Sequence, residues 1–225
     1  MGGKRSGFKK GVEIHLRKII IWPDKKTVSK ALALKPDVLL YDSSEVQKLL
    51  TGKLELLEIY NAQGKKIGVA SRKASHALHL IDRVAHVFVF NSKGELFLQK
   101  RTMTKDVFPG YYAPSGSGHL NLEESPKKAA LRELNEEIGI QATTEQIIEI
   151  GSFKCFTKEM KELIYVFMLI TNQEPKINPE EVSEAKYYSI REIKKMNKKL
   201  FIPALKKELQ LYLKKMLRNL PKQVC

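Results

Sequence analysis

"GHLNLEESPKKAALRELNEEIGI", residues 118–140, places Glu133, Glu136 and Glu137 within five positions of one another. Positions three and four apart are neighbours on an α-helix, so the three carboxylates share one face of a helix formed here. Like charges at that spacing cost about 0.2–0.5 kcal/mol per pair on an exposed helix. Because a hard divalent cation would remove this repulsion, the crowding indicates a metal site.

Residues that begin and end helices mark the limits of this one. Ser125 is a typical N-cap, Pro126 suits the first helical position, and Gly139 suits the C-terminal stop. An apolar stripe beside the glutamates is predicted to pack on a sheet: Ala130, Leu131, Leu134 and Ile138. The stretch FPGYYAPSGSG, residues 108–118, reads as a loop. Mg²⁺ takes few carboxylates and leaves room for substrate phosphates, so loop and helix together predict a diphosphate–metal site.

The rest of the chain reads as strands followed by helices. Two stretches predict β-hairpins, because β-rich runs flank short polar turns: 56–72 and 86–101. Further strands are predicted at 147–156, 162–170 and 185–190, and helices from 191 onward with an interruption at Pro203. Near the N-terminus, KIIIWP (18–23) suggests a strand and DKKTVSKALAL (24–34) a short helix.

Composition excludes several classes of protein. The two cysteines, Cys155 and Cys225, cannot form a disulfide framework, and no CxxC pair suggests zinc or redox chemistry. No apolar run approaches the roughly 20 residues that cross a bilayer. The first ten residues lack the apolar core of a secretory signal. We therefore expect a cytoplasmic protein in a reducing compartment.

The net charge of +15 lies in the two flanks of the chain. Residues 1–30 carry nine Lys or Arg against two acids, and residues 191–225 carry eleven against two. Two interpretations stay open: solvated helix faces, or attraction to a polyanion such as nucleic acid or anionic lipid. The N-terminal MGGKRS fits the pattern for myristoylation at Gly2. Only with that modification do we expect membrane binding.

The stretch that opens this section resembles the Nudix box, Gx5Ex7REUxEExGU with U aliphatic. Every fixed position is filled: Gly118, Glu124, Arg132, Glu133, Leu134, Glu136, Glu137, Gly139 and Ile140. Three further stretches resemble the Nudix branch related to isopentenyl-diphosphate isomerase: 56–72, 86–112 and 180–193. The resemblance implies an α/β fold, the Nudix α/β/α sandwich with a mixed β-sheet. We expect this domain at 55–190, between a basic N-terminal extension (1–54) and a basic C-terminal helical segment (191–225).

The resemblance also implies an activity, a metal and its ligands. Most family members cleave a nucleoside diphosphate linked to another moiety, so we expect a hydrolase of phosphorus-containing anhydrides with a small-molecule diphosphate substrate. Four groups would hold Mg²⁺ or Mn²⁺: the carboxylates of Glu133, Glu136 and Glu137 and the backbone carbonyl of Ser117. Glu124 would support the site, and Arg132 would orient the glutamates. The chemistry agrees, because cleaving a diphosphate needs charge neutralisation and an activated water.

An isomerase is the alternative from a different reaction class. The isomerase has a cysteine where this chain has Ser117, although His119 keeps the histidine that follows. Asp82 replaces another expected histidine, with His76 and His79 close upstream, and Glu162 aligns with an isomerase glutamate. Loss of the thiol removes the protonating group, and isomerases usually lack the full REUxEE set. Both departures favour hydrolysis.

Other candidates lie outside the box. Arg101 and Lys105 align with residues that grip the diphosphate in the isomerase; the alternative is a surface cation pair. His119 and His86 are candidates for substrate contacts, or structural histidines. Three carboxylates are candidates for a base outside the box, or ordinary surface groups: Glu162, Glu181 and Glu184.

The substrate is not specified by any signature in this sequence, and neither is the oligomeric state. A further alternative makes the basic flanks an RNA-binding surface and the 5′ end of an RNA the substrate. No basic stripe with interleaved aromatic residues supports it, so we expect a small molecule. The paired lysines of 194–215 are spaced between apolar residues, as on the wet side of a packed amphipathic helix.

Overall fold

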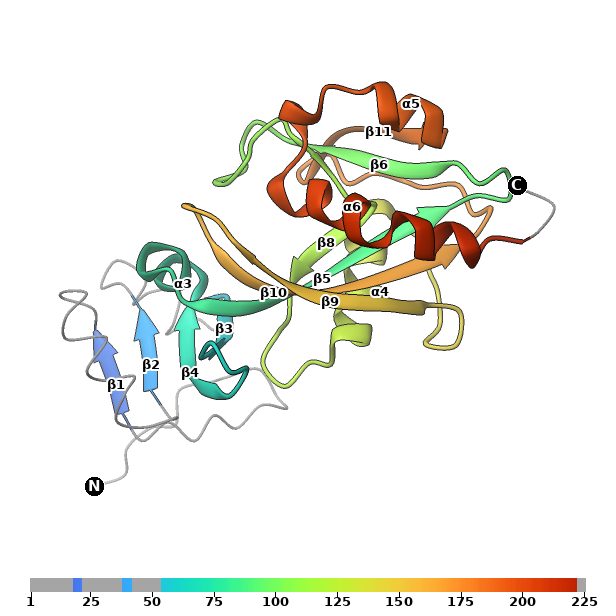
Figure 1. Ribbon diagram of the computed structural model, residues 1–225. Helices are drawn as coiled ribbons and strands as arrows, with labels where there is room; N and C mark the ends of the chain where they lie inside the picture. Colours follow the sequence, from blue (N-terminus) through green and yellow to red (C-terminus); the bar gives the residue numbers. More distant parts are fainter. Residues whose placement is uncertain (1–17, 22–37, 42–53, 222–225) are drawn as a thin grey trace. The chain divides into compact units, whose positions relative to one another are not determined.

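The computed structural model describes residues 18–21, 38–41 and 54–221 (Figure 1). The chain divides into two units, residues 1–83 with 158–161, and residues 84–157 with 162–225. The predicted helix at 24–34 and the myristoylation motif at Gly2 lie outside the described residues. The domain limits at 54 and 190 stay predictions.

Among the described residues, the first unit contains a small sheet and one helix. Its strands are β1 (Lys18–Ile21), β2 (Val38–Tyr41), β3 (Leu56–Tyr60) and β4 (Lys66–Ser71), in the order β1-β2-β4-β3. β3 and β4 form the predicted antiparallel hairpin, whereas β2 runs parallel to both β1 and β4. Helix α3 (Arg72–Leu78) follows and was not predicted. Ser71 caps it by accepting a 3.1 Å hydrogen bond from the backbone N–H of Ala74.

The second unit is built around a long central strand. β5 (Ile81–Phe90) begins in the first unit and then pairs with β6 (Leu96–Arg101), β8 (Gly116–His119) and β10 (Lys161–Ile170). β9 (Ile148–Phe156) pairs with the far side of β10. β7 (Tyr112–Ala113) and β11 (Val182–Tyr188) pair with β6. The hairpin at 86–101 and the strands predicted at 147–156, 162–170 and 185–190 are confirmed, although the last begins three residues earlier and ends two residues earlier than predicted.

Helices cover both faces of this sheet. Ala85, Val87 and Val89 pack with helix α4 (Pro126–Ile138), whereas Phe88 and Phe90 pack with the C-terminal helix α6 (Pro203–Arg218). Residues 87–90 of β5 are therefore apolar on both faces, which a strand needs when it is covered on both sides. The predicted α/β/α sandwich with a mixed sheet is confirmed.

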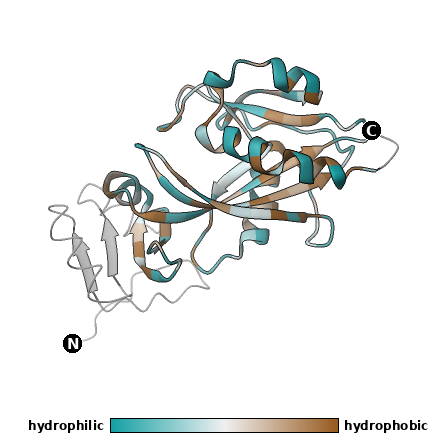
Figure 2. Cartoon of the chain, viewed as in Figure 1, coloured by the Kyte–Doolittle hydropathy of each residue, from teal (hydrophilic) through white to brown (hydrophobic). Residues whose placement is uncertain are grey.

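The described part of the C-terminal segment contains three helical pieces. α5 (Ile190–Lys195) begins at a capping box made by Ser189 and Glu192, and a short 3₁₀ turn, η2, covers Lys198–Leu200. α6 then begins at Pro203, the residue predicted to interrupt the helical pattern. Figure 2 shows hydrophilic and hydrophobic residues alternating along α6, as expected for a helix with one face on the domain.

One prediction about the fold is wrong in part. The stretch 108–118 is not all loop, because it contains β7 and the first three residues of β8. The glycines that suggested a loop instead let β8 lie close to helix α4. A Cβ added at Gly116 would lie 3.4 Å from Leu134 Cδ2. β8 pairs with β5 in the register Ser117 to His86, so the segment before the helix is held in the sheet.

Candidate functional site

Helix α4 begins and ends where the sequence predicted. The Ser125 hydroxyl accepts a hydrogen bond from the backbone N–H of Lys128, and Pro126 occupies the first helical turn. Gly139 has a φ of +65°, a left-handed conformation that glycine adopts without strain. Its added Cβ would also lie 3.2 Å from the Cβ of Lys176, a close contact that adds to the reason for glycine here.

The three box glutamates differ in exposure. Glu133 and Glu137 are buried, with 9% and 5% of their surface exposed, whereas the side chain of Glu136 is 54% exposed. The Oε2 atom of Glu137 accepts a 2.7 Å hydrogen bond from Gln99 Nε2 and a 2.8 Å bond from the backbone N–H of Ser117. Strands β6 and β8 thus fix the carboxylate of Glu137.

Arg132 connects the glutamates to one another. Its Nε and Nη2 atoms donate to the two oxygens of Glu124 at 3.0 and 2.9 Å, a bidentate pair. Nη1 donates to Glu133 Oε1 at 2.5 Å and to Glu136 Oε2 at 2.9 Å. Nη2 also donates to the backbone carbonyl of His119 at 2.9 Å. One guanidinium therefore fixes two ligand candidates against the strand that carries Ser117.

Gly118 makes room for this arrangement. A Cβ built on Gly118 would lie 2.0 Å from Glu133 Oε1 and 2.1 Å from its Cδ. The carboxylate of Glu133 therefore occupies the space that any side chain at residue 118 would need. Steric crowding by Glu133 therefore explains why the first position of the box is a glycine.

Burial and mutual repulsion perturb the glutamates. Burial, and then the nearby charge of Glu137, raise the pKa of Glu133 to about 7, although Arg132 opposes the shift. Burial raises the pKa of Glu137 to about 7 against the hydrogen bonds from Gln99 and Ser117. Burial also acts to raise the pKa of Glu124, but its bonds with Arg132 outweigh this and lower it. In turn, those bonds and the charge of Glu133 outweigh the effect of burial and raise the pKa of Arg132.

These residues fit a divalent cation. Two buried carboxylates with pKa values near 7 repel each other in the protein as it stands, and a cation would favour their ionised forms. The donor set consists of carboxylate oxygen atoms, to which the backbone carbonyl of Ser117 would add another oxygen, and Mg²⁺ and Mn²⁺ prefer such ligands. The roles of Glu133, Glu136, Glu137 and Ser117 as ligands stay predictions.

Arg101 and Lys105 lie on the β6 side of the site. Both positive charges act to lower the pKa of the Glu137 carboxyl, against the larger effect of burial that raises it. The Nε atom of Arg101 donates to the carbonyl of Val107 at 3.1 Å, which ties the following loop to the end of β6. The ammonium of Lys105 forms an ion pair with the Oε2 atom of Glu181. The role of Arg101 and Lys105 in binding the diphosphate stays a prediction.

The other candidates occupy separate surroundings. His86 is buried, and its Nδ1 atom lies 2.7 Å from Oε1 of Glu208 on α6. Burial lowers the pKa of His86, but the charge of Glu208 and the hydrogen bond to it outweigh this and raise it. Glu162 is buried on β10 near this pair. Glu184, by contrast, is exposed and pairs with Lys100 at 3.1 Å.

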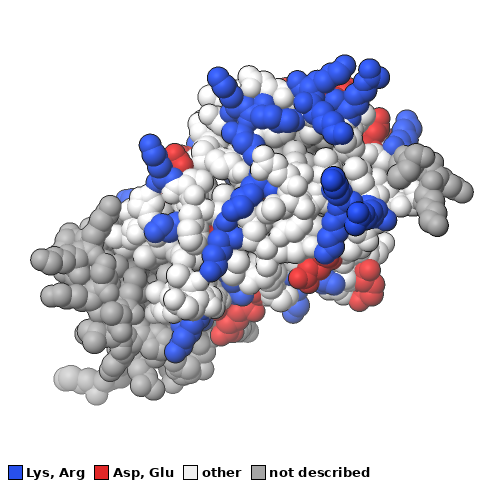
Figure 3. All heavy atoms as spheres, in the orientation of Figure 1, with Lys and Arg blue, Asp and Glu red and all other residues white. Residues whose placement is uncertain are grey.

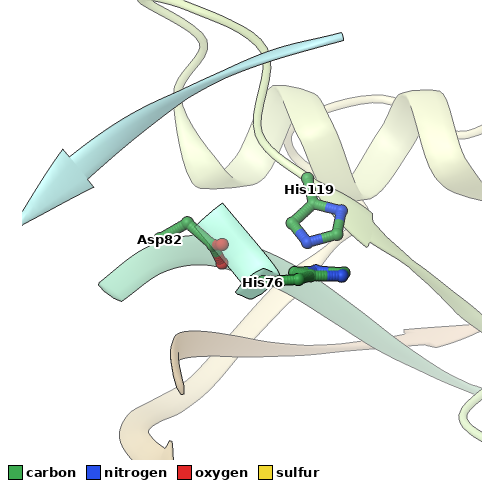
Figure 4. A group of neighbouring side chains, drawn as sticks. All are labelled: His76, Asp82 and His119. Atoms are coloured by element: carbon green, nitrogen blue, oxygen red, sulfur yellow. The ribbon is translucent and has the colours of Figure 1, made fainter. Parts of the chain in front are cut away.

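The upstream histidines and Asp82 belong to the first unit. Asp82 is buried and accepts a 2.6 Å hydrogen bond from the Ser75 hydroxyl, and burial raises its pKa to about 7. His76 lies on α3, and His79 ends that helix with a left-handed φ of +52°. Figure 4 draws His76 and Asp82. It also draws His119, which belongs to β8 of the second unit.

Two residues of this region were not found from the sequence. Gln99 holds Glu137, and Glu208 holds His86. Each is a buried polar residue in an apolar setting: Gln99 follows Leu96, Phe97 and Leu98 in β6, and Glu208 lies on the inner face of α6. A polar side chain at a core position was the available signal, because burial of such a group requires a partner.

Basic side chains gather over α5 and the neighbouring surface (Figure 3). On α6, however, two of the paired lysines are engaged with the sheet. Lys207 and Lys215 donate to the carbonyls of Lys154 and Ile150 on β9, at 2.8 and 2.5 Å. Part of the C-terminal charge thus has a structural use. None of the helices among the described residues has the length and apolar character needed to cross a membrane.

Comparison with known proteins shows which of them this chain is similar to. The family model for the NUDIX domain matches residues 80–209. The chain is 33% identical over 135 residues to the Nudix hydrolase PA4841 of Pseudomonas aeruginosa, across 59% of this chain and 78% of that protein. It is 30% identical over 142 residues to isopentenyl-diphosphate Delta-isomerase 2 of Photorhabdus laumondii, across 62% and 80%. The MutT protein from Methanosarcina mazei shares the fold, with a TM-score of 0.54 at 21% identity over 60% of this chain and 95% of that one.

Proposed function

The chain belongs to the Nudix family of pyrophosphohydrolases, and from this premise we propose that it cleaves a diphosphate linkage with Mg²⁺ or Mn²⁺ bound at Glu133, Glu136 and Glu137. The proposed substrate is a nucleoside diphosphate derivative or a related small molecule. The observation that carries the proposal is the arrangement around Arg132, which joins Glu124, Glu133 and Glu136 while Glu137 is fixed by β6 and β8.

The side chains divide the work of binding and cleavage. A bound divalent cation would neutralise phosphoryl oxygens and lower the pKa of a coordinated water. Arg132 keeps Glu133 and Glu136 in place, and Gln99 does the same for Glu137, so that no ligand has to be reordered on binding. Arg101 and Lys105 supply positive charge beside Glu137, where the negative charge of the diphosphate is concentrated. Glu136 is the box carboxylate that solvent water reaches.

The relative named as an isopentenyl-diphosphate isomerase supports a second candidate with the same diphosphate group. Ser117 weighs against it, because a serine hydroxyl is a far weaker acid than the thiol that the isomerases carry at this position. His119, Glu162 and the two cations remain compatible with that activity. Isomerisation is therefore the alternative outcome of the same experiment.

A substrate panel tests the proposal. The purified protein is incubated with Mg²⁺ and nucleotide sugars, dinucleotide polyphosphates, coenzyme A, isopentenyl diphosphate and a short 5′-triphosphorylated RNA. Phosphate is measured after coupling to a phosphatase, and the isoprenoid is checked for dimethylallyl diphosphate. We expect cleavage of at least one small diphosphate, weakly dependent on salt, and no isomerisation. Dimethylallyl diphosphate as the product would favour the isomerase, and RNA cleavage with steep salt dependence would favour a polymer substrate.

A further inference from the structure

The ion pair between Lys105 and Glu181 raises a question that the proposed function leaves open. Lys105 is proposed to contact the substrate diphosphate, yet its ammonium is bound to a carboxylate of the same chain. The side chain of Lys105 is only 18% exposed, and that of Glu181 is 37% exposed. The pair is therefore more shielded from solvent than the surface pairs that contribute nothing measurable.

Backbone contacts hold Glu181 in this place. Glu181 belongs to the segment 176–181, whose first residues lie against the C-terminal end of α4. There the backbone N–H groups of Lys176 and Asn178 donate to the carbonyls of Ile138 and Glu137 at 2.7 and 2.8 Å. The segment ends at β11, where the carbonyl of Glu181 accepts a 3.3 Å hydrogen bond from the N–H of Thr102. Glu181 is thus fixed to helix α4 on one side and, through Thr102, to the start of the loop that carries Lys105 on the other.

The Lys105 charge acts on the box as well as on Glu181. It acts on the buried carboxyl of Glu137, together with the charge of Arg101. Lys105 therefore lies where a diphosphate bound at the glutamates would seek a cation. A diphosphate oxygen and the Glu181 carboxylate would then compete for one ammonium.

We propose that Glu181 is an internal competitor for the substrate diphosphate, holding Lys105 in the free protein and releasing it when the diphosphate binds. Glu181 positions Lys105 and does not itself contact the reacting atoms. No covalent bond changes in this exchange, because one anionic partner of the ammonium replaces another. The displaced carboxylate is already partly exposed and can turn to solvent. The inference rests on the proposed function, since it takes a diphosphate as the ligand.

Competition from Glu181 would keep the affinity of the protein for the diphosphate below its maximum. Removing the Glu181 charge takes one competing anion away from Lys105, so the diphosphate should bind about three- to tenfold more tightly, the range for a partly shielded ion pair. After cleavage, a product with a single phosphate competes less well for Lys105 than the diphosphate did. The return of Glu181 to Lys105 then assists release of that product.

Calorimetry with methylenediphosphonate, a diphosphate that cannot be hydrolysed, tests the inference in Mg²⁺ buffer on the full chain. The variants are Glu181→Gln, Lys105→Gln and the double variant. Glu184→Gln is the matched control, because it removes the same charge from a pair with Lys100. Lys100 and Gln99 are adjacent on β6, so their side chains point to opposite faces of the strand and Lys100 points away from Glu137. Glu181→Ala repeats the test by truncation.

We expect Glu181→Gln and Glu181→Ala to lower the Kd about three- to tenfold, with Glu184→Gln within twofold of the wild type. Lys105→Gln should weaken binding, and more so when Glu181 is already Gln. Unchanged or weaker binding in both Glu181 variants, with measurable binding by the wild type, would overturn the inference and leave the proposed function intact. No binding of this probe by the wild type would overturn the inference, whereas the proposed function fails only if no member of the substrate panel is cleaved.

Discussion

Gly118→Ala is the substitution for which the structure makes the sharpest prediction. The new Cβ would lie 2.0 Å from Glu133 Oε1 and 2.1 Å from Cδ, far inside van der Waals contact. The backbone of Gly118 lies in β8 and its φ is not positive, so alanine can adopt this backbone conformation. What must move is the Glu133 carboxylate, which would lose its 2.5 Å bond with Arg132.

The expected loss is therefore larger for activity than for stability. Crowding of this kind costs about 1–3 kcal/mol of unfolding free energy. If Glu133 is a metal ligand as proposed, displacing its carboxylate by about an ångström costs about a hundredfold in rate. Circular dichroism melting and the coupled phosphate assay measure the two effects separately.

Gly116→Ala is the control for this substitution. It lies two residues away on the same strand face, and its Cβ would meet Leu134 Cδ2 at 3.4 Å, close to ordinary contact. We expect this variant to keep its activity within a few fold. Wild-type turnover by Gly118→Ala, or equal losses in the two variants, would refute the steric argument.

Three further predictions concern metal, support and packing. In the folded metal-free protein, Glu133 and Glu137 have pKa values of about 7, above the ordinary 4.5. The folded state therefore binds more protons than the unfolded state between these values, and the free energy of unfolding falls as the pH rises from 4.5 to about 7. Mg²⁺ should thus raise the Tm more at pH 8 than at pH 5; an equal shift would contradict this. Gln99→Leu should reduce kcat/KM about 10- to 100-fold with little change in Tm, because Glu137 loses a supporting bond; a loss of Tm alone would argue against it. Lys215→Met should lower the Tm by a few degrees relative to the exposed control Lys214→Met, since it removes the hydrogen bond that Lys215 donates to the carbonyl of Ile150.

The fold could be predicted from sequence where local chemistry decides it. Ser125, Pro126 and Gly139 limit α4 by capping preferences that act within a turn, and the structure follows them. Strand β8 could not be found in this way. Gly116 and Gly118 have weak strand preference, and they lie in β8 because β5 pairs with them and α4 packs against them. Helix α3 was missed because it follows a hairpin strand directly.

The candidate site shows the same division. The box positions can be read from spacing along one helix, since 3.6 residues per turn places Glu133, Glu136 and Glu137 together. Their partners come from elsewhere in the chain: Gln99 from β6, and Glu181 from the segment before β11. No local pattern brings residues 38 or 76 positions apart into contact. Such contacts follow only from the sheet topology.

The basic flanks illustrate what charge counting leaves open. The sequence allowed both a solvated helix face and a polyanion surface for the lysines of 194–215. In the structure, Lys207 and Lys215, with the hydroxyl of Tyr212, donate to alternate carbonyls of β9: those of Lys154, Ile150 and Ser152. β9 ends the strand path in the described part of the chain, so these donors satisfy carbonyls that would otherwise lie open. The remaining lysines keep the polyanion interpretation as a prediction.

The most direct test of the account is phosphate release from the best panel substrate across a Mg²⁺ titration, for the wild type and for Glu137→Gln. Glu137 is fixed by Gln99 and Ser117, and the neutral amide keeps its shape without its charge. We predict saturable Mg²⁺ dependence and no turnover in EDTA for the wild type, with most of the rate lost in the variant at every Mg²⁺ concentration. Turnover that persists in EDTA, or equal titration curves for the two proteins, would contradict the central claim that the box glutamates hold a metal ion for diphosphate cleavage.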